Sequence, residues 1–149
     1  MSKFHFRLAT LLRLRETTRD ECRVQLAESH RADAELQSQQ GRLSSEQQEL
    51  QHQCRTAASP GAVDLPRLVE AQQYASALRI QEAELQRQRQ ALAVEIDRRR
   101  QALLDADRDM RTLEKLRENQ LQTYRQEEDR QEGKRLDEAA LQAVRTSLS

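Results

Sequence analysis

A single strong break, at Pro60-Gly61, separates two long stretches of this sequence that contain almost no turn-forming residues. Asp64 is suited to cap the N-terminus of a new helix, and Pro66 is tolerated in the first turn of one. The spacing predicts one domain over residues 1–149, with a helix over about 4–55, a turn over about 56–65 and a second helix over about 65–144.

The composition favours helices and excludes most other folds. Hydrophobic residues make up 36% of the 149 residues and charged residues 34%, against about 45–50% and 25% in ordinary soluble domains. There is no Trp, and there are two Phe and two Tyr. Such a chain lacks the β-branched and aromatic residues that sheets need, and the apolar volume that an enzyme core needs.

Heptad spacing runs along both predicted helices. On the first helix the seam residues are Leu8, Arg15, Cys22, Ser29, Leu36, Leu43 and Leu50, together with Leu12, Arg19, Leu26, Asp33, Gln40, Gln47 and Cys54. On the second they are Ala71, Leu78, Leu85, Leu92, Arg99, Ala106 and Leu113, together with Ala75, Glu82, Arg89, Ile96, Leu103, Met110, Arg117 and Tyr124. The pattern predicts an all-α fold, in which two long helices form an antiparallel coiled-coil hairpin and the second helix is the longer.

The register of that hairpin stays open, because shifts of one heptad look equally good. Folding back at Pro60-Gly61 places Leu8 opposite a point between Met110 and Arg117, and leaves the second helix without an intrachain partner from about Glu118. Apolar residues continue along this overhang; they are Leu121, Tyr124, Leu136, Ala140 and Val144. A lone helix is marginal in water, so the overhang either frays or is covered by another protein.

Several functions find no support in the residues. Three glycines exclude both common nucleotide-binding loops, and His52 and Cys54 point in different directions on a helix, so they do not form a metal pair. We therefore expect no catalytic residues, no cofactor, no metal and no enzymatic activity. A net charge of zero argues against nucleic-acid binding. No apolar run reaches the length of about 18–20 residues that spans a bilayer, so we expect a cytoplasmic protein without membrane insertion.

Short motifs at both ends of the chain resemble the flagellar FliJ family. They are Phe6-Arg7-Leu8 and Leu11-Leu12-Arg13-Leu14-Arg15-Glu16 near the start, and Gln72-Gln73-Tyr74 with Leu78 after the turn. Near the end they are Leu113-Glu114-Lys115-Leu116, Tyr124-Arg125 and Lys134-Arg135-Leu136-Asp137-Glu138-Ala139-Ala140. The resemblance extends to the length, the position of the turn and the long second helix.

The resemblance implies a non-enzymatic stalk of the flagellar type III export apparatus, located in the cytoplasm and associated peripherally with the inner membrane. The implied partners are the hexameric export ATPase, the membrane export gate protein and export chaperones. The ATPase-facing residues would be Phe6, Leu8, Leu12, Leu136, Asp137 and Glu138. We add Leu121 and Tyr124 to this group, because they are apolar residues of the predicted overhang. The gate-facing residues would be Tyr74, Leu78 and Gln81, with Leu43, Gln47 and Leu50 facing them from the first helix.

Three other functions remain open at this point. They are the stalk of a virulence-type secretion system, a general coiled-coil chaperone and a structural tether. A chaperone should carry an apolar stripe at its tip, whereas the tip of this hairpin reads Ala57-Ala58-Ser59-Pro60.

Overall fold

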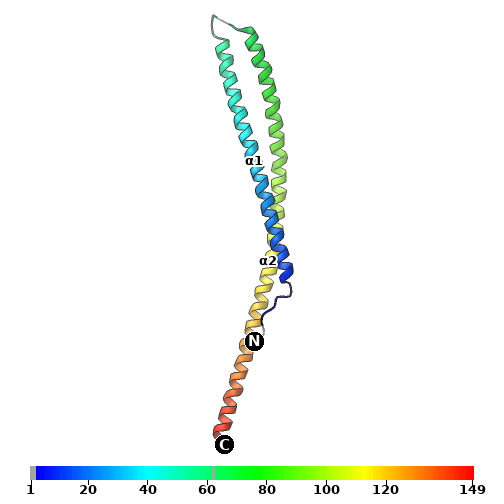
Figure 1. The fold of residues 1–149 in the computed structure, drawn as a ribbon, viewed down its shortest axis with the longest axis vertical. Helices are drawn as coiled ribbons and strands as arrows, with labels where there is room; N and C mark the ends of the chain where they lie inside the picture. Colours follow the sequence, from blue (N-terminus) through cyan, green and yellow to red (C-terminus); the bar gives the residue numbers. More distant parts are fainter. Residues whose placement is uncertain (1–2, 62) are drawn as a thin grey trace. The chain divides into compact units, whose positions relative to one another are not determined.

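A computed structural model describes residues 3–61 and 63–149, most of which form two helices. Helix α1 spans Ala9–Ala57 and helix α2 spans Leu65–Leu148 (Figure 1). Hydrogen bonds between side chains of the two helices run in antiparallel order, so the predicted hairpin with a longer second helix is confirmed. The chain divides into two compact units: residues 3–20 with 104–149, and residues 21–103.

The chain turns between Ala57, the last residue of α1, and Leu65, the first residue of α2. Gly61 adopts a φ of +103°, a left-handed conformation that glycine tolerates and that other residues rarely take. The backbone carbonyl of Asp64 accepts the first helical hydrogen bond of α2, from Leu68 N at 3.1 Å. The Asp64 carboxylate accepts a longer bond from Arg67 N at 3.4 Å. Asp64 is therefore the N-cap of α2, and Pro66 lies in its first turn.

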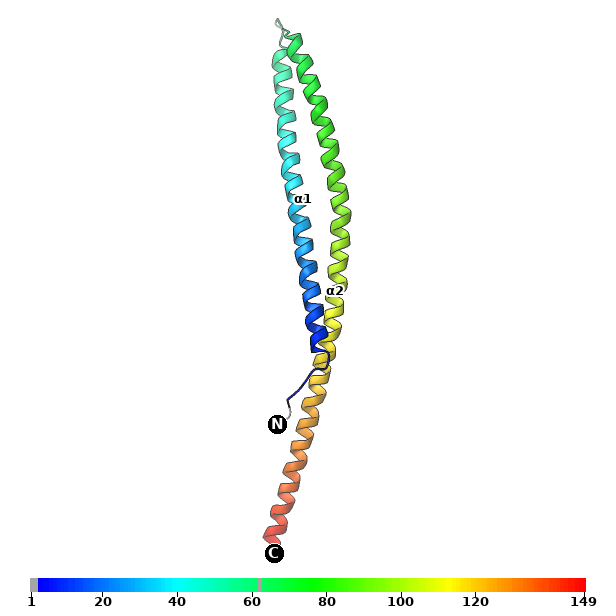
Figure 2. The same cartoon turned by 45° about the vertical axis from the view of Figure 1, so that its right-hand side comes forward.

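The beginning of α1 differs from the prediction. The helix begins at Ala9 rather than at about Phe4, and residues 3–6 have no regular structure. This non-helical segment puts the Phe6 side chain into the core, where it is only 5% exposed. It also brings the Phe4 ring to 5.6 Å from the ring of Tyr124 on α2. Figure 1 and Figure 2 both show the dark-blue segment that precedes α1 running beside α2. Burial of these two aromatic rings outweighs the small gain from one further turn of helix.

In the unit of residues 3–20 and 104–149, a small core lies near the start of α1. Phe6, Leu12 and Met110 are buried there, and Phe4, Leu8, Ala9 and Leu113 pack against them. The contact of Leu8 with this cluster agrees with its predicted position opposite α2. The contact between Phe4 and Tyr124 corrects the predicted start of the overhang, because the chain covers α2 at least as far as Tyr124 rather than to about Glu118.

In the unit of residues 21–103, the core lies close to the turn. Leu43, Leu50 and Leu78 are buried, and Ala71, Ala75 and Leu85 pack against them. Leu78 is the most deeply buried of these, at 1% exposure.

The predicted seam describes the burial pattern closely. Every seam residue predicted for the first helix is buried or half-buried, including the polar ones and Leu8, which directly precedes α1. On α2 the same holds for every predicted seam residue except Glu82 and Arg117, which are exposed. The heptad spacing therefore identifies the contact faces of both helices.

Leu78 should contribute more to stability than its neighbour Ile80, because Ile80 is 72% exposed. We expect Leu78→Ala to lower the free energy of unfolding by about 2–4 kcal/mol, since it leaves a cavity in the seam. Ile80→Ala should change it by less than about 0.5 kcal/mol, as is usual at the surface. Urea unfolding followed by circular dichroism measures both. Equal effects of the two substitutions would mean that Leu78 is not in the core.

Candidate partner-binding surfaces

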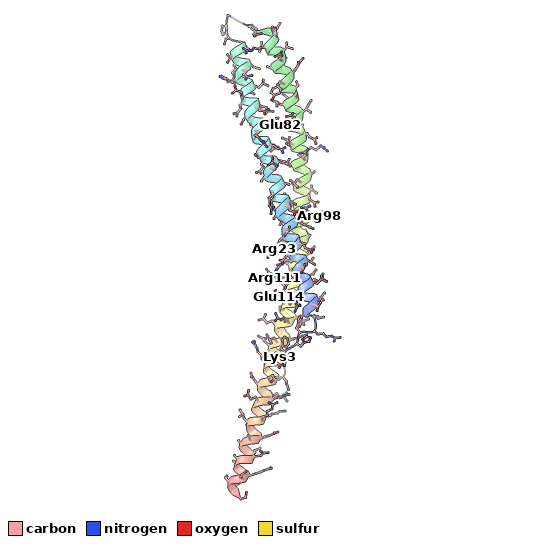
Figure 3. All side chains as sticks on the ribbon, viewed as in Figure 1. Lys3, Arg23, Glu82, Arg98, Arg111 and Glu114 are labelled. Carbon is pink, nitrogen blue, oxygen red and sulfur yellow. The ribbon has the colours of Figure 1, made fainter. Side chains whose placement is uncertain are left out.

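The last part of α2 carries the largest run of exposed side chains. From Arg125 to Ser149 every residue is exposed except Gly133, and the side chains of this segment stand out from the helix (Figure 3). Residues 125–135 contain no apolar side chain. The segment therefore begins with a polar stretch, and its apolar side chains lie beyond it. We call residues 125–149 the tail.

Apolar side chains form one face of the tail after the polar stretch. Leu136, Leu141, Val144 and Leu148 are 65%, 60%, 54% and 83% exposed. Residues spaced by three or four positions lie on one side of a helix, so these four residues and Ala140 form a broad apolar face. The sequence reading included Leu136, Ala140 and Val144 but missed Leu141 and Leu148, which the same spacing could have identified.

Charged side chains accompany this apolar face. Asp137 and Glu138 are exposed beside Leu136, and Glu127 lies 4.0 Å from Arg130 in an exposed ion pair. A surface of this kind combines an apolar strip with charges of both signs. It suits a protein partner better than an anionic membrane or a nucleic acid, both of which would repel its carboxylates.

The remaining residues of the predicted ATPase-facing group lie elsewhere. Phe6 and Leu12 are buried and Leu8 is half-buried in the core of their unit. Leu121 is half-buried, and Tyr124 contacts Phe4. Of the eight residues, the structure therefore leaves three exposed on the tail: Leu136, Asp137 and Glu138.

The predicted gate-facing residues differ among themselves in exposure. Tyr74 is 50% exposed, and its hydroxyl donates a hydrogen bond of 3.1 Å to the Glu46 carboxylate on α1. This bond and the negative charge of Glu46 raise the pKa of the Tyr74 hydroxyl. Gln81 is exposed, whereas Leu78 is buried in the core and presents no surface to a partner.

Gln81 lies on a groove between α1 and α2. The groove has a volume of about 640 Å³, and Leu43, Leu85 and the exposed Ile80 form its apolar part. Glu46 also lines it, which connects the groove with the hydroxyl of Tyr74. Tyr74, Glu46, Ile80 and Gln81 thus form one continuous surface, which we call the groove surface.

Of the three α1 residues predicted to face the gate, only Leu43 lines the groove. Leu43 and Leu50 are buried, and Gln47 is half-buried, with its side-chain amide donating to Glu82 at 3.1 Å. Glu46 is the α1 residue that faces Tyr74, and the sequence reading missed it. Its position next to the seam residue Gln47, with a charged side chain, is the feature that could have identified it.

An arginine occupies the seam at the end of the unit of residues 21–103 that lies far from the turn. Arg99 donates hydrogen bonds of 2.6 Å to the Gln25 carbonyl and to the Ser29 hydroxyl on α1. It also pairs with Glu95 on its own helix at 2.9 Å. Glu95 accepts further bonds from Arg98, and these two guanidinium groups lower its pKa to about 2.

The described residues carry neither a metal-binding cluster nor a membrane span. Over residues 3–61 and 63–149, no group of three or more His, Cys, Asp or Glu side chains could hold a metal ion. In the same ranges neither helix has a stretch apolar enough to cross a bilayer.

Comparison with known proteins gives one result. The sequence matches the family of the flagellar FliJ protein over residues 4–149, which is essentially the whole chain. No curated protein and no solved structure matches it. The match covers both the groove surface and the tail, so the chain belongs to the flagellar FliJ family.

Proposed function

We propose that this chain is the non-enzymatic central stalk of the flagellar export ATPase, and that its tail enters the hexameric ATPase ring. The supporting observation is the apolar face of the tail, which the described part of the chain leaves uncovered. Family membership supports a role in the flagellar export apparatus. The stalk would promote assembly and activity of the ring and would hydrolyse nothing itself.

Energetic considerations favour a socket for the tail. Burial of one leucine side chain contributes roughly 2 kcal/mol, and the tail exposes Leu136, Leu141 and Leu148. A ring lined with apolar groups and with cations opposite Asp137 and Glu138 would bury the leucines and pair the carboxylates. The charges would set the orientation of the tail more than the affinity.

We further propose that the groove surface binds the membrane export gate protein, and that export chaperones dock on the same apparatus. Tyr74 supports this role because an aromatic ring with a polar tip is common at the centre of protein interfaces. Ile80 adds an exposed apolar side chain beside it. Through these partners the protein would lie in the cytoplasm, peripherally associated with the inner membrane.

If the tail enters the ATPase ring through its apolar face, stimulation of the ATPase should depend on the leucines of the tail and not on its polar side. We expect Leu136→Asp with Leu141→Asp to abolish most of the stimulation of the purified export ATPase, because two buried contacts become charged. Ending the chain at Glu132 should have the same effect. The matched control is Gln142→Asp, which adds a charge on the polar side of the tail. Full stimulation by the double variant or by the truncated chain would contradict the proposal.

The groove proposal predicts that Tyr74→Ala weakens gate binding without unfolding the hairpin. We expect the dissociation constant for the detergent-solubilised gate protein to rise at least ~10-fold, which corresponds to about 1.4 kcal/mol. Helicity should stay unchanged, because the Tyr74 ring lies at the surface. Gln73→Ala, on the exposed neighbour, is the control and should bind normally. If binding and helicity fell together, Tyr74 would be only a structural residue.

A further inference from the structure

A charged layer interrupts the apolar seam in the middle of the unit of residues 21–103. Arg89 on α2 reaches across to α1, where it donates to the Asp33 carboxylate at 3.0 Å and to the Gln40 side chain at 2.9 Å. Its side chain is 33% exposed and that of Asp33 is 26% exposed. Arg89 therefore lies between two seam residues of α1 that are one heptad apart.

Two further polar contacts fit the same alignment of the helices. Arg99 reaches the Ser29 hydroxyl, farther from the turn than Arg89. On the other side, Glu82 accepts a hydrogen bond from Gln47. All three contacts join residues of the two helices within this unit, so they report one register.

Sliding α2 along α1 by one heptad in either direction disrupts these polar contacts between the helices. If Arg89 moves along α1 toward the turn, it would lie beside Gln47 instead of Asp33. The Asp33 carboxylate would then lie between the apolar side chains of Ile96 and Leu103. A carboxylate that is removed from water without a partner is strongly destabilising.

The opposite shift creates a different conflict. It would place Glu82 against Asp33, two carboxylates of like charge. It would also move Arg89 between Leu26 and Asp33, so that half of its present polar environment would become apolar. By contrast, where the seam contains only leucine and alanine, a shift of one heptad still places apolar side chains opposite apolar side chains. Such stretches therefore do not discriminate between registers.

We propose that Asp33, Gln40 and Arg89 fix the register of α1 against α2 in this unit, at some cost in stability. Polar residues at single seam positions are known to specify the alignment of coiled coils in this way. The register has a consequence for the groove surface, because it places Glu46 beside Tyr74. A shift of one heptad would bring Gln39 or Gln53 there instead. The inference rests on contacts within the hairpin and stands apart from the proposed gate binding.

Distance measurements between two spin labels test this directly. The labels are attached to cysteines at the exposed positions Ser38 and Ala102, in a chain whose Cys22 and Cys54 are replaced by Ala. These sites are offset along the helix pair, so a slip of one heptad changes their separation by about 10 Å. The variant is Asp33→Leu with Arg89→Leu, which makes the layer apolar.

We expect a single distance in the parent chain and two or more distances, about 10 Å apart, in the double variant. The variant should remain as helical as the parent and melt at the same temperature or higher. The matched control is Glu84→Leu with Arg87→Leu, an exposed ion pair within α2, which should keep the single distance. A single unchanged distance in the Asp33/Arg89 variant would overturn the proposal. So would loss of folding, because the layer would then be required for stability rather than for register.

Discussion

The narrow seam between α1 and α2 is the interaction on which the rest of the structure depends. Each helix presents a single strip of side chains, and only nine residues of the described chain are buried. Eight of these are apolar, and they gather mainly into two clusters, one near the turn and one near the start of α1. Because most helical stability comes from packing rather than from propensity, long helices with so few buried residues depend on each contact along the seam.

The polar residues between the clusters give the seam its specificity. Leucine strips alone would tolerate several alignments, whereas Arg89 and Arg99 each have partners at particular positions on α1. Replacement of such pairs by apolar residues often stabilises a protein, so their presence is weak evidence for stability. These pairs fix the register of α1 against α2, and the register determines which side chains form the groove surface.

Periodicity predicted the two helices, the turn and nearly every seam residue, because an amphipathic strip is a local property of the sequence. It failed where distant parts of the chain meet. The contact of Phe4 with Tyr124 depends on where the two helices lie along each other, and so does the pairing of Tyr74 with Glu46. The register stays open as long as only the apolar residues of the two seams are matched. A comparison of Asp33, Glu82 and Arg89 across the seam would have favoured one alignment. For Leu78 the heptad spacing predicts a seam position, whereas the family resemblance implies a partner surface; its burial agrees with the seam.

We propose that the apolar face of the tail, which is bare in the free protein, is covered in the complex with the export ATPase. Amide hydrogen exchange of residues 136–148, followed by mass spectrometry with and without the ATPase ring, tests it most directly. In the free protein these amides should exchange fast, because an unsupported helix opens readily. In the complex they should exchange at least ~10-fold more slowly, while amides near Leu43 and Leu50 in the hairpin core stay unchanged. Equal exchange of residues 136–148 in both samples, under conditions where the ATPase is stimulated, would contradict the account.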